Sequence, residues 1–88
     1  IIIEKNIINK LDFKIFKKKF DIIFIDPPYK EKNLSYILDS IYVSNTLHKD
    51  GIIIIHRHKK EKDKFPEIFN IIEEKIYGIS KVIFGSFF

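Results

Sequence analysis

The strongest constraint on the fold is an almost continuous apolar run from Phe20 to Ile25, which two consecutive prolines end directly after Asp26. Apolar runs without polar alternation are typical of strands buried on both faces, as in parallel sheets. Proline has no N–H for a sheet ladder and restricts the residue before it, so the strand cannot continue. Ligands bind at the carboxyl ends of such strands, and here that end carries Asp26, Pro27, Pro28 and Tyr29.

The rest of the chain predicts further strands and one long helix around this central strand. Helical spacing of Leu34, Ile37, Leu38, Ile41 and Tyr42 predicts a helix from Asn33 or Ser35 to about Leu47. We expect the chain to turn out of this helix at Asp50-Gly51. The other predicted elements are a strand end at Ile1–Ile3, a short helix at Asn6–Leu11, a buried strand at Ile52–Ile55, and two strands, Ile71–Tyr77 and Ile79–Phe87, joined around Gly78. This order predicts an open α/β sheet, parallel in its first part, with an antiparallel hairpin at one edge.

Length and composition restrict the class of protein further. The chain has 88 residues, no cysteine and no methionine, and its formal net charge is +4. Without cysteine there are no disulfides, no thiolate metal sites and no cysteine nucleophile. We expect a cytoplasmic chain, because no apolar run is long enough for a bilayer and no leader is recognisable. The chain begins inside a predicted strand and lacks an initiating methionine, so we interpret residues 1–88 as part of a larger domain. The 15 lysines fit nucleic-acid binding and AT-rich codon usage equally well.

The turn that ends the central strand has the chemistry to hold an amino-bearing base. The Asp26 carboxylate and the Pro27 carbonyl can each accept an N–H from an exocyclic amine, and the two prolines add no competing donors. Tyr29 can stack on the ring. When both hydrogens of the amine are bonded to acceptors, its nitrogen becomes pyramidal. The nitrogen lone pair can then attack a methyl sulfonium. A simple strand-ending turn is the alternative for the same four residues, because Pro and Asp are common in turns, but the buried strand before them and the predicted helix after them favour the functional interpretation.

The strand, turn and hairpin patterns of the chain resemble those in the C-terminal half of the RsmD family, the small-subunit rRNA guanine-N2 methyltransferases. The similar segments are Phe20–Tyr29, Asp50–Ile55 and Glu74–Val82. The resemblance implies a Rossmann-like class I methyltransferase sheet, S-adenosylmethionine as cofactor, 16S rRNA or the small ribosomal subunit as partner, no metal, and a monomeric full-length protein. The implied residues are Asp26, Pro27, Pro28 and Tyr29 for catalysis, Asn6, Ile7 and Asp26 for the cofactor, and Tyr29, Tyr77, Gly78 and Lys81 for the substrate.

The chain departs from the family pattern in two ways. His56 stands where relatives usually have Glu, and no glycine-rich cofactor loop is present, so that loop would precede Ile1. The strand order implied by the family also separates Ile1–Ile3 from Phe20–Ile25 by two further strands. We therefore expect the Phe20–Ile25 strand to have a bare apolar edge, and the chain alone to be inactive and not to bind the cofactor.

Several other functions remain open on the sequence. Methylation of adenine N6 in DNA uses the same Asp-Pro-Pro-Tyr loop, whereas methylation of a release-factor glutamine is disfavoured because that family usually has Asn in place of Asp26. A non-catalytic remnant that binds nucleic acid through its lysines is the alternative from another class. The histidines offer no clean metal-ligand spacing, and no serine has the context of a nucleophile elbow.

Overall fold

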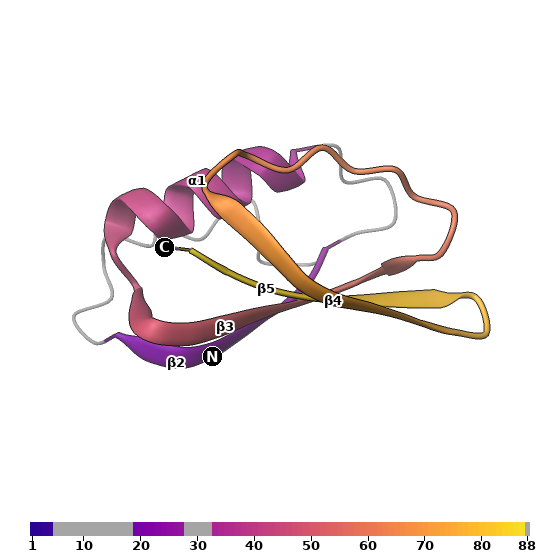
Figure 1. Ribbon diagram of the computed structural model, residues 1–88, viewed down its shortest axis with the longest axis horizontal. Helices are drawn as coiled ribbons and strands as arrows, with labels where there is room; N and C mark the ends of the chain where they lie inside the picture. Colours follow the sequence, from indigo (N-terminus) through magenta and orange to yellow (C-terminus); the bar gives the residue numbers. More distant parts are fainter. Residues whose placement is uncertain (5–18, 28–32, 88) are drawn as a thin grey trace.

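The computed structural model describes residues 1–4, 19–27 and 33–87, which form one mixed sheet and one helix (Figure 1). The strands stand in the order β1-β2-β3-β5-β4. Strands β1, β2 and β3 run parallel, whereas β5 is antiparallel to both β3 and β4. The predicted parallel sheet with a terminal hairpin is therefore confirmed. The elements are β1 (Ile2–Glu4), β2 (Phe20–Asp26), α1 (Leu34–Ser44), β3 (Leu47–His58), β4 (Phe69–Tyr77) and β5 (Ser80–Phe87).

The core lies between the sheet and α1, which covers one side of the sheet (Figure 1). Residues of a strand alternate between the two faces, so Ile23 and Ile25 of β2 share the buried face with Ile53 and Ile55 of β3. Burial of each such side chain contributes about 1.5–3 kcal/mol. The opposite face is more open, as Ile22 and Ile52 show by their exposure. From the helix, the core receives Leu34, Ile37, Leu38 and Ile41.

The position of the first strand differs from the expectation. Strand β1 pairs directly with β2, with Ile2 opposite Phe24 and Ile3 opposite Ile25. The expected separation of the two strands is therefore wrong for this chain, and β1 covers the expected bare edge of β2 from Phe24 to Asp26. The physical reason is that β2 offers unpaired ladder groups and a buried-face isoleucine, and the fully buried Ile3 continues that apolar face by one strand. The predicted helix at residues 6–11 lies outside the described residues.

The connection from α1 to β3 also differs from the expectation. The helix ends at Ser44, and Asn45 adopts the left-handed conformation (φ 56°) that commonly closes a helix. Asp50 and Gly51 therefore do not form the exit turn but lie within β3. They lie in an irregular part of the pairing with β2. Phe20 and Ile22 are two residues apart in β2, but their partners in β3, Leu47 and Ile52, are five residues apart. In the described part of the chain, no helix is long and apolar enough to cross a membrane.

The terminal hairpin depends on two glycines for different reasons. Gly78 has φ +57° and opens the two-residue loop between Tyr77 and Ser80, the position that type II′ hairpin turns give to glycine. Gly85 lies under the ring of Phe69, and β4 carries a bulge between Ile71 and Glu73 next to it. The close approach of this ring to the β5 backbone leaves no room for a side chain at residue 85.

We therefore expect Gly85→Ala to destabilise the fold more than Gly78→Ala. The new methyl group would overlap the Phe69 ring and approach the Asn70 carbonyl oxygen to 2.8 Å, so an overpacking cost of about 1–3 kcal/mol or more follows. At residue 78 nothing lies within 4 Å, so the cost there is the positive φ alone, about 1–2 kcal/mol. Urea unfolding followed by circular dichroism measures both. A Gly85→Ala variant as stable as the parent chain would contradict this packing.

Candidate functional site

The predicted acidic residue lies at the carboxyl end of a central strand and contacts a histidine of the next strand. Asp26 is the last residue of β2, and His56 of β3 lies beside it, one residue beyond the Ile25–Ile55 pair. The distance between Asp26 Oδ1 and His56 Nδ1 is 3.1 Å. Both side chains are about two-fifths exposed (39% and 40%). The pair therefore belongs to the surface of the site and not to the core.

A third side chain continues this contact across the sheet. The Nε2 atom of His56 lies 3.0 Å from the hydroxyl oxygen of Ser80, the first residue of β5. His56 is paired with Val82 in the antiparallel ladder, so Ser80 is its diagonal neighbour on the same face. Asp26, His56 and Ser80 thus form a hydrogen-bonded chain across three neighbouring strands. They line a pocket of about 200 Å³ together with Pro27, Arg57, His58 and Ile79.

On the opposite face of the sheet from Asp26, His56 and Ser80, buried charged side chains link β3 and β5 to the segment that follows β3. The guanidinium of Arg57, which is 3% exposed, donates to both carboxylate oxygens of Asp63, at 2.9 and 2.8 Å. Its neighbour across the ladder is Lys81, whose ammonium donates to the Glu61 carbonyl oxygen at 2.6 Å. Both contacts fasten the segment that follows β3 against the sheet, and this arrangement fixes the end of the strand that carries His56.

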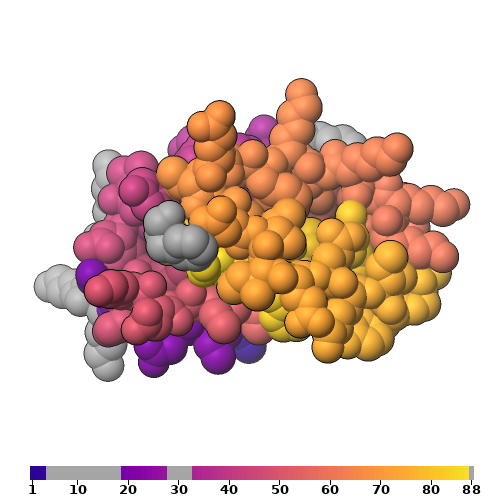
Figure 2. Space-filling model, in the orientation of Figure 1, coloured from indigo at the N-terminus to yellow at the C-terminus, as the bar shows by residue number. Residues whose placement is uncertain are grey.

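The residues predicted from the sequence are only partly brought together. Asp26 and Pro27 lie in the same pocket, as predicted for a strand end. Tyr77 and Gly78 lie at the turn of the β4–β5 hairpin, and Tyr77 is 59% exposed. Figure 2 shows this hairpin, in orange to yellow, over much of one side of the visible face. Their role in substrate binding stays a prediction, as does that of Lys81. The remaining predicted residues, Asn6, Ile7, Pro28 and Tyr29, lie outside the described residues.

The two residues that sequence reasoning missed are the partners of Asp26. The sequence pattern marks His56 as a departure from the family and places Ser80 within the family-like segment Glu74–Val82, but neither observation predicts a contact with Asp26. The alternation of His56 and His58 does predict that they share a face, and both line the pocket. The contacts themselves depend on the register between strands that are 24 and 30 residues apart in sequence, which no local pattern gives.

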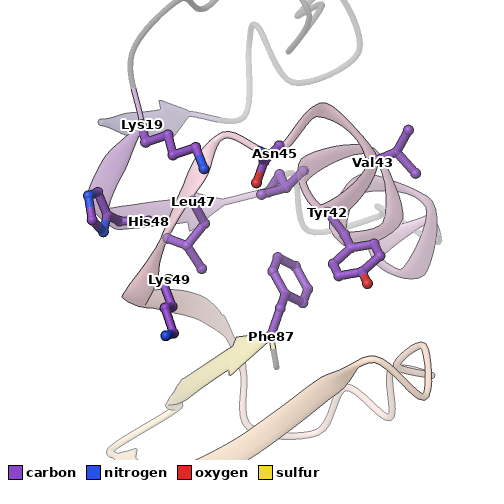
Figure 3. A pocket seen from close by; sticks show the side chains of 9 residues that line it. Lys19, Tyr42, Val43, Asn45, Leu47, His48, Lys49 and Phe87 are labelled. Carbon is purple, nitrogen blue, oxygen red and sulfur yellow. The ribbon is translucent and has the colours of Figure 1, made fainter.

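A second pocket, of about 580 Å³, lies where α1 ends and β3 begins (Figure 3). The rings of Tyr42 and Phe87 meet edge to face there, with centroids 5.4 Å apart. Basic side chains of Lys19, His48 and Lys49 surround it. None of the described residues that were predicted for the site lines it. With lysine so abundant in the chain, two lysines beside a pocket do not by themselves indicate a ligand. The other lining residues are Ile41, Val43, Asn45 and Leu47.

Metal-ligating side chains do not gather anywhere in residues 1–4, 19–27 and 33–87: no group of three or more His, Cys, Asp or Glu could hold an ion there. Asp26 and His56 form a pair without a third such ligand in the described parts. The chemistry that this arrangement offers is therefore that of an oriented carboxylate. One Asp26 oxygen is bonded to the ring of His56, and the other can accept an N–H from a ligand in the pocket.

Comparisons with known proteins place this geometry in a family. The model of the family described as "Conserved hypothetical protein 95" matches residues 3–86. An uncharacterized methylase of Rickettsia prowazekii (strain Madrid E) is 32% identical over 83 residues, which are 89% of this chain and 35% of the relative.

Solved structures show the same fold. A conserved hypothetical protein of Streptococcus pyogenes matches with a TM-score of 0.71 and 27% identity, over 83% of this chain and 46% of that protein. A provisionally named methylase of Haemophilus influenzae matches with a TM-score of 0.64 and 24% identity, over 77% of this chain and 42% of that protein. The chain thus spans about a third of the curated relative and less than half of each of these structures.

Proposed function

Because the chain belongs to the family described as "Conserved hypothetical protein 95", we propose that it forms the base-binding half of a methyltransferase. The proposed reaction transfers a methyl group from S-adenosylmethionine to the exocyclic N2 amine of a guanine in small-subunit rRNA. The observation that carries this proposal is the Asp26 carboxylate at the carboxyl end of β2, oriented by His56 in a pocket that Pro27 also lines. The methylase name of the Rickettsia relative supports it as well.

The geometry suits an amine that must become a nucleophile. His56 contacts one oxygen of Asp26, and the other oxygen accepts no hydrogen bond from the described residues. That oxygen and the Pro27 carbonyl can accept the two N–H groups of the amine, since Pro27 contributes no donor. Held in this way, the nitrogen directs its lone pair away from both acceptors. The carboxylate also stabilises the positive charge that develops on the nitrogen during transfer.

The atoms of the proposed step balance without a covalent enzyme intermediate. The amine nitrogen forms a bond to the methyl carbon, and the bond between that carbon and sulfur breaks with its electrons going to sulfur. The nitrogen then gives up one proton, to the Asp26 carboxylate or to water, and leaves as a neutral methylated amine. S-adenosylmethionine supplies the methyl group as a sulfonium when it is bound.

The described residues fit only one end of this cofactor. A carboxylate at the strand end, such as Asp26, can face a sulfonium cation. The other residues predicted to contact the cofactor, Asn6 and Ile7, lie outside the described residues. We therefore propose that cofactor binding requires a larger protein of the length of the relatives, and that the 88-residue chain alone does not bind it. Isothermal titration of the chain with S-adenosylmethionine tests this, and micromolar binding would contradict it.

A chimera tests the proposed substrate. In it, this chain replaces the segment that it matches in the Rickettsia relative, so that the relative supplies the remainder of the domain. We expect methyl-labelled S-adenosylmethionine to label small-subunit rRNA, and nucleoside mass spectrometry to find N2-methylguanine. The unmodified relative is the control for folding and cofactor binding. Label on adenine N6 of duplex DNA would contradict the guanine substrate, and an active relative with a folded but inactive chimera would contradict methyl transfer by this chain.

A further inference from the structure

The chain of contacts from Asp26 through His56 to Ser80 has a consequence for the reaction itself. We propose, resting on the proposed function, that His56 is a positioning residue: it donates from Nδ1 to Asp26, accepts from Ser80 at Nε2, and so holds the carboxylate in the orientation that receives the substrate amine. Two contacts support this, 3.1 Å to Asp26 Oδ1 and 3.0 Å to Ser80 Oγ. The three residues come from three different strands, so the fold itself sets their relative positions.

The direction of the two hydrogen bonds follows from the chemistry of the partners. An ionised carboxylate only accepts hydrogen bonds, so the ring nitrogen facing Asp26 must carry a hydrogen. In the neutral imidazole the second nitrogen then has a free lone pair, which can only accept. The Ser80 hydroxyl, which can rotate, therefore donates to Nε2. Each ring nitrogen has a partner of the right kind, and this fixes both the tautomer and the ring plane.

A fixed ring determines where the free oxygen of Asp26 points. The side chain of an aspartate can rotate its carboxylate plane freely unless one oxygen is bonded to a rigid partner. His56 is such a partner, because its own ring is held at the far side by Ser80. The exposure of both side chains means that this hydrogen bond contributes little to stability, since water can replace either partner. Its main effect is therefore on orientation and not on folding.

The same connectivity, from aspartate to Nδ1 and from Nε2 to serine, occurs in serine hydrolases. The location of Ser80 argues against nucleophilic catalysis here. In α/β-hydrolases the serine lies on a sharp turn from a strand into a helix, which presents its hydroxyl to the substrate. Ser80 instead begins β5 after the hairpin loop and is paired in the ladder with both His58 and Tyr77. We therefore assign Ser80 to holding the ring.

The first test needs neither substrate nor cofactor. Long-range ¹H–¹⁵N spectra of the 88-residue chain distinguish a protonated from an unprotonated ring nitrogen. We expect the neutral form of His56 to show a protonated Nδ1 and an unprotonated Nε2, and Asp26→Ala to remove this preference. A bare Nδ1 with a protonated Nε2 would overturn the proposal. So would labelling of Ser80 by a fluorophosphonate probe, which reports a nucleophilic serine. Because this test involves no methyl transfer, its outcome is independent of the proposed function.

The second test uses two amide substitutions in the chimera. His56→Asn places an amide N–H near the position of Nδ1, whereas His56→Gln places it near Nε2. If His56 positions Asp26, His56→Asn retains most of kcat, while His56→Gln and His56→Ala lower kcat about tenfold to a hundredfold, as misplaced reacting groups do. We expect little change in KM or melting temperature. Equal activity of the Asn and Gln variants, or losses that follow the melting temperature, would overturn the assignment.

Discussion

Replacing Asp26 with alanine in the chimera is expected to lower kcat for methyl transfer by at least about 10²–10³-fold, the usual cost of removing one preorganised electrostatic contact to the reacting group. The carboxylate is proposed to accept an amine N–H and to stabilise the positive nitrogen, and alanine can do neither. Binding of S-adenosylmethionine should change little, because most cofactor contacts are proposed to lie elsewhere. Single-turnover rates and cofactor titration together measure both effects.

Asp21 provides a matched control for this prediction. It lies on the same strand, carries the same charge and is exposed, but it stands at the other end of β2 from the pocket. Asp21→Ala therefore removes one negative charge from β2 without touching the site, and we expect nearly unchanged activity. Full activity of the Asp26→Ala variant would contradict the mechanism. Equal losses in both variants would point to net charge, and would contradict a specific role for Asp26.

The parts of the fold that could be predicted are those that local patterns determine. The apolar run of β2 and the proline after Asp26 give the strand and its end, and helical spacing gives the buried face of α1. The Asp50-Gly51 pair predicts a turn, and a local irregularity does occur there, but it lies inside β3. The helix instead ends before Asn45, which adopts a left-handed conformation. Apart from glycine, asparagine is one of the few residues that adopt this conformation readily. Two competing turn signals five residues apart could not be ranked from the sequence.

Long-range pairing accounts for what the sequence could not show. The position of β1 beside β2 depends on which ladder groups are free in the folded chain. The contacts of His56 depend on the register of β3 with β2 and with β5, which is set by many side chains together. Asp26 could be predicted because a strand end is a local feature and the carboxyl edge of a parallel sheet binds ligands. Its partners His56 and Ser80 could not be predicted, because no local sequence pattern around either residue indicates that it lies close to Asp26.

The second large effect concerns stability and the buried charge beneath the site. We expect Arg57→Met to cost about 3–5 kcal/mol, because it leaves the Asp63 carboxylate buried without its partner. The side chains of Arg57 and Asp63 are only 2% and 7% exposed, and two hydrogen bonds join them. For a domain with a total stability of about 5–15 kcal/mol this is a large fraction. Urea unfolding monitored by circular dichroism measures the loss.

A double variant separates the ion pair from simple packing. Arg57→Met combined with Asp63→Leu removes the doubly hydrogen-bonded pair and keeps apolar volume. The Glu61 carboxylate, 3.5 Å from Arg57, stays in place but is 19% exposed and can turn to water. We therefore expect the double variant to recover most of the lost stability, as replacing a whole buried pair often does. Lys75→Ala is the matched control, since the Lys75–Glu73 pair is about half exposed at 3.6 Å and should cost less than about 1 kcal/mol. A double variant no more stable than Arg57→Met would show that shape, not charge, holds the segment after β3. Because Arg57 and His56 are neighbours on opposite faces of β3, recovery of stability with the His56 tautomer unchanged would mean that the fold and the site depend on separate contacts of one strand.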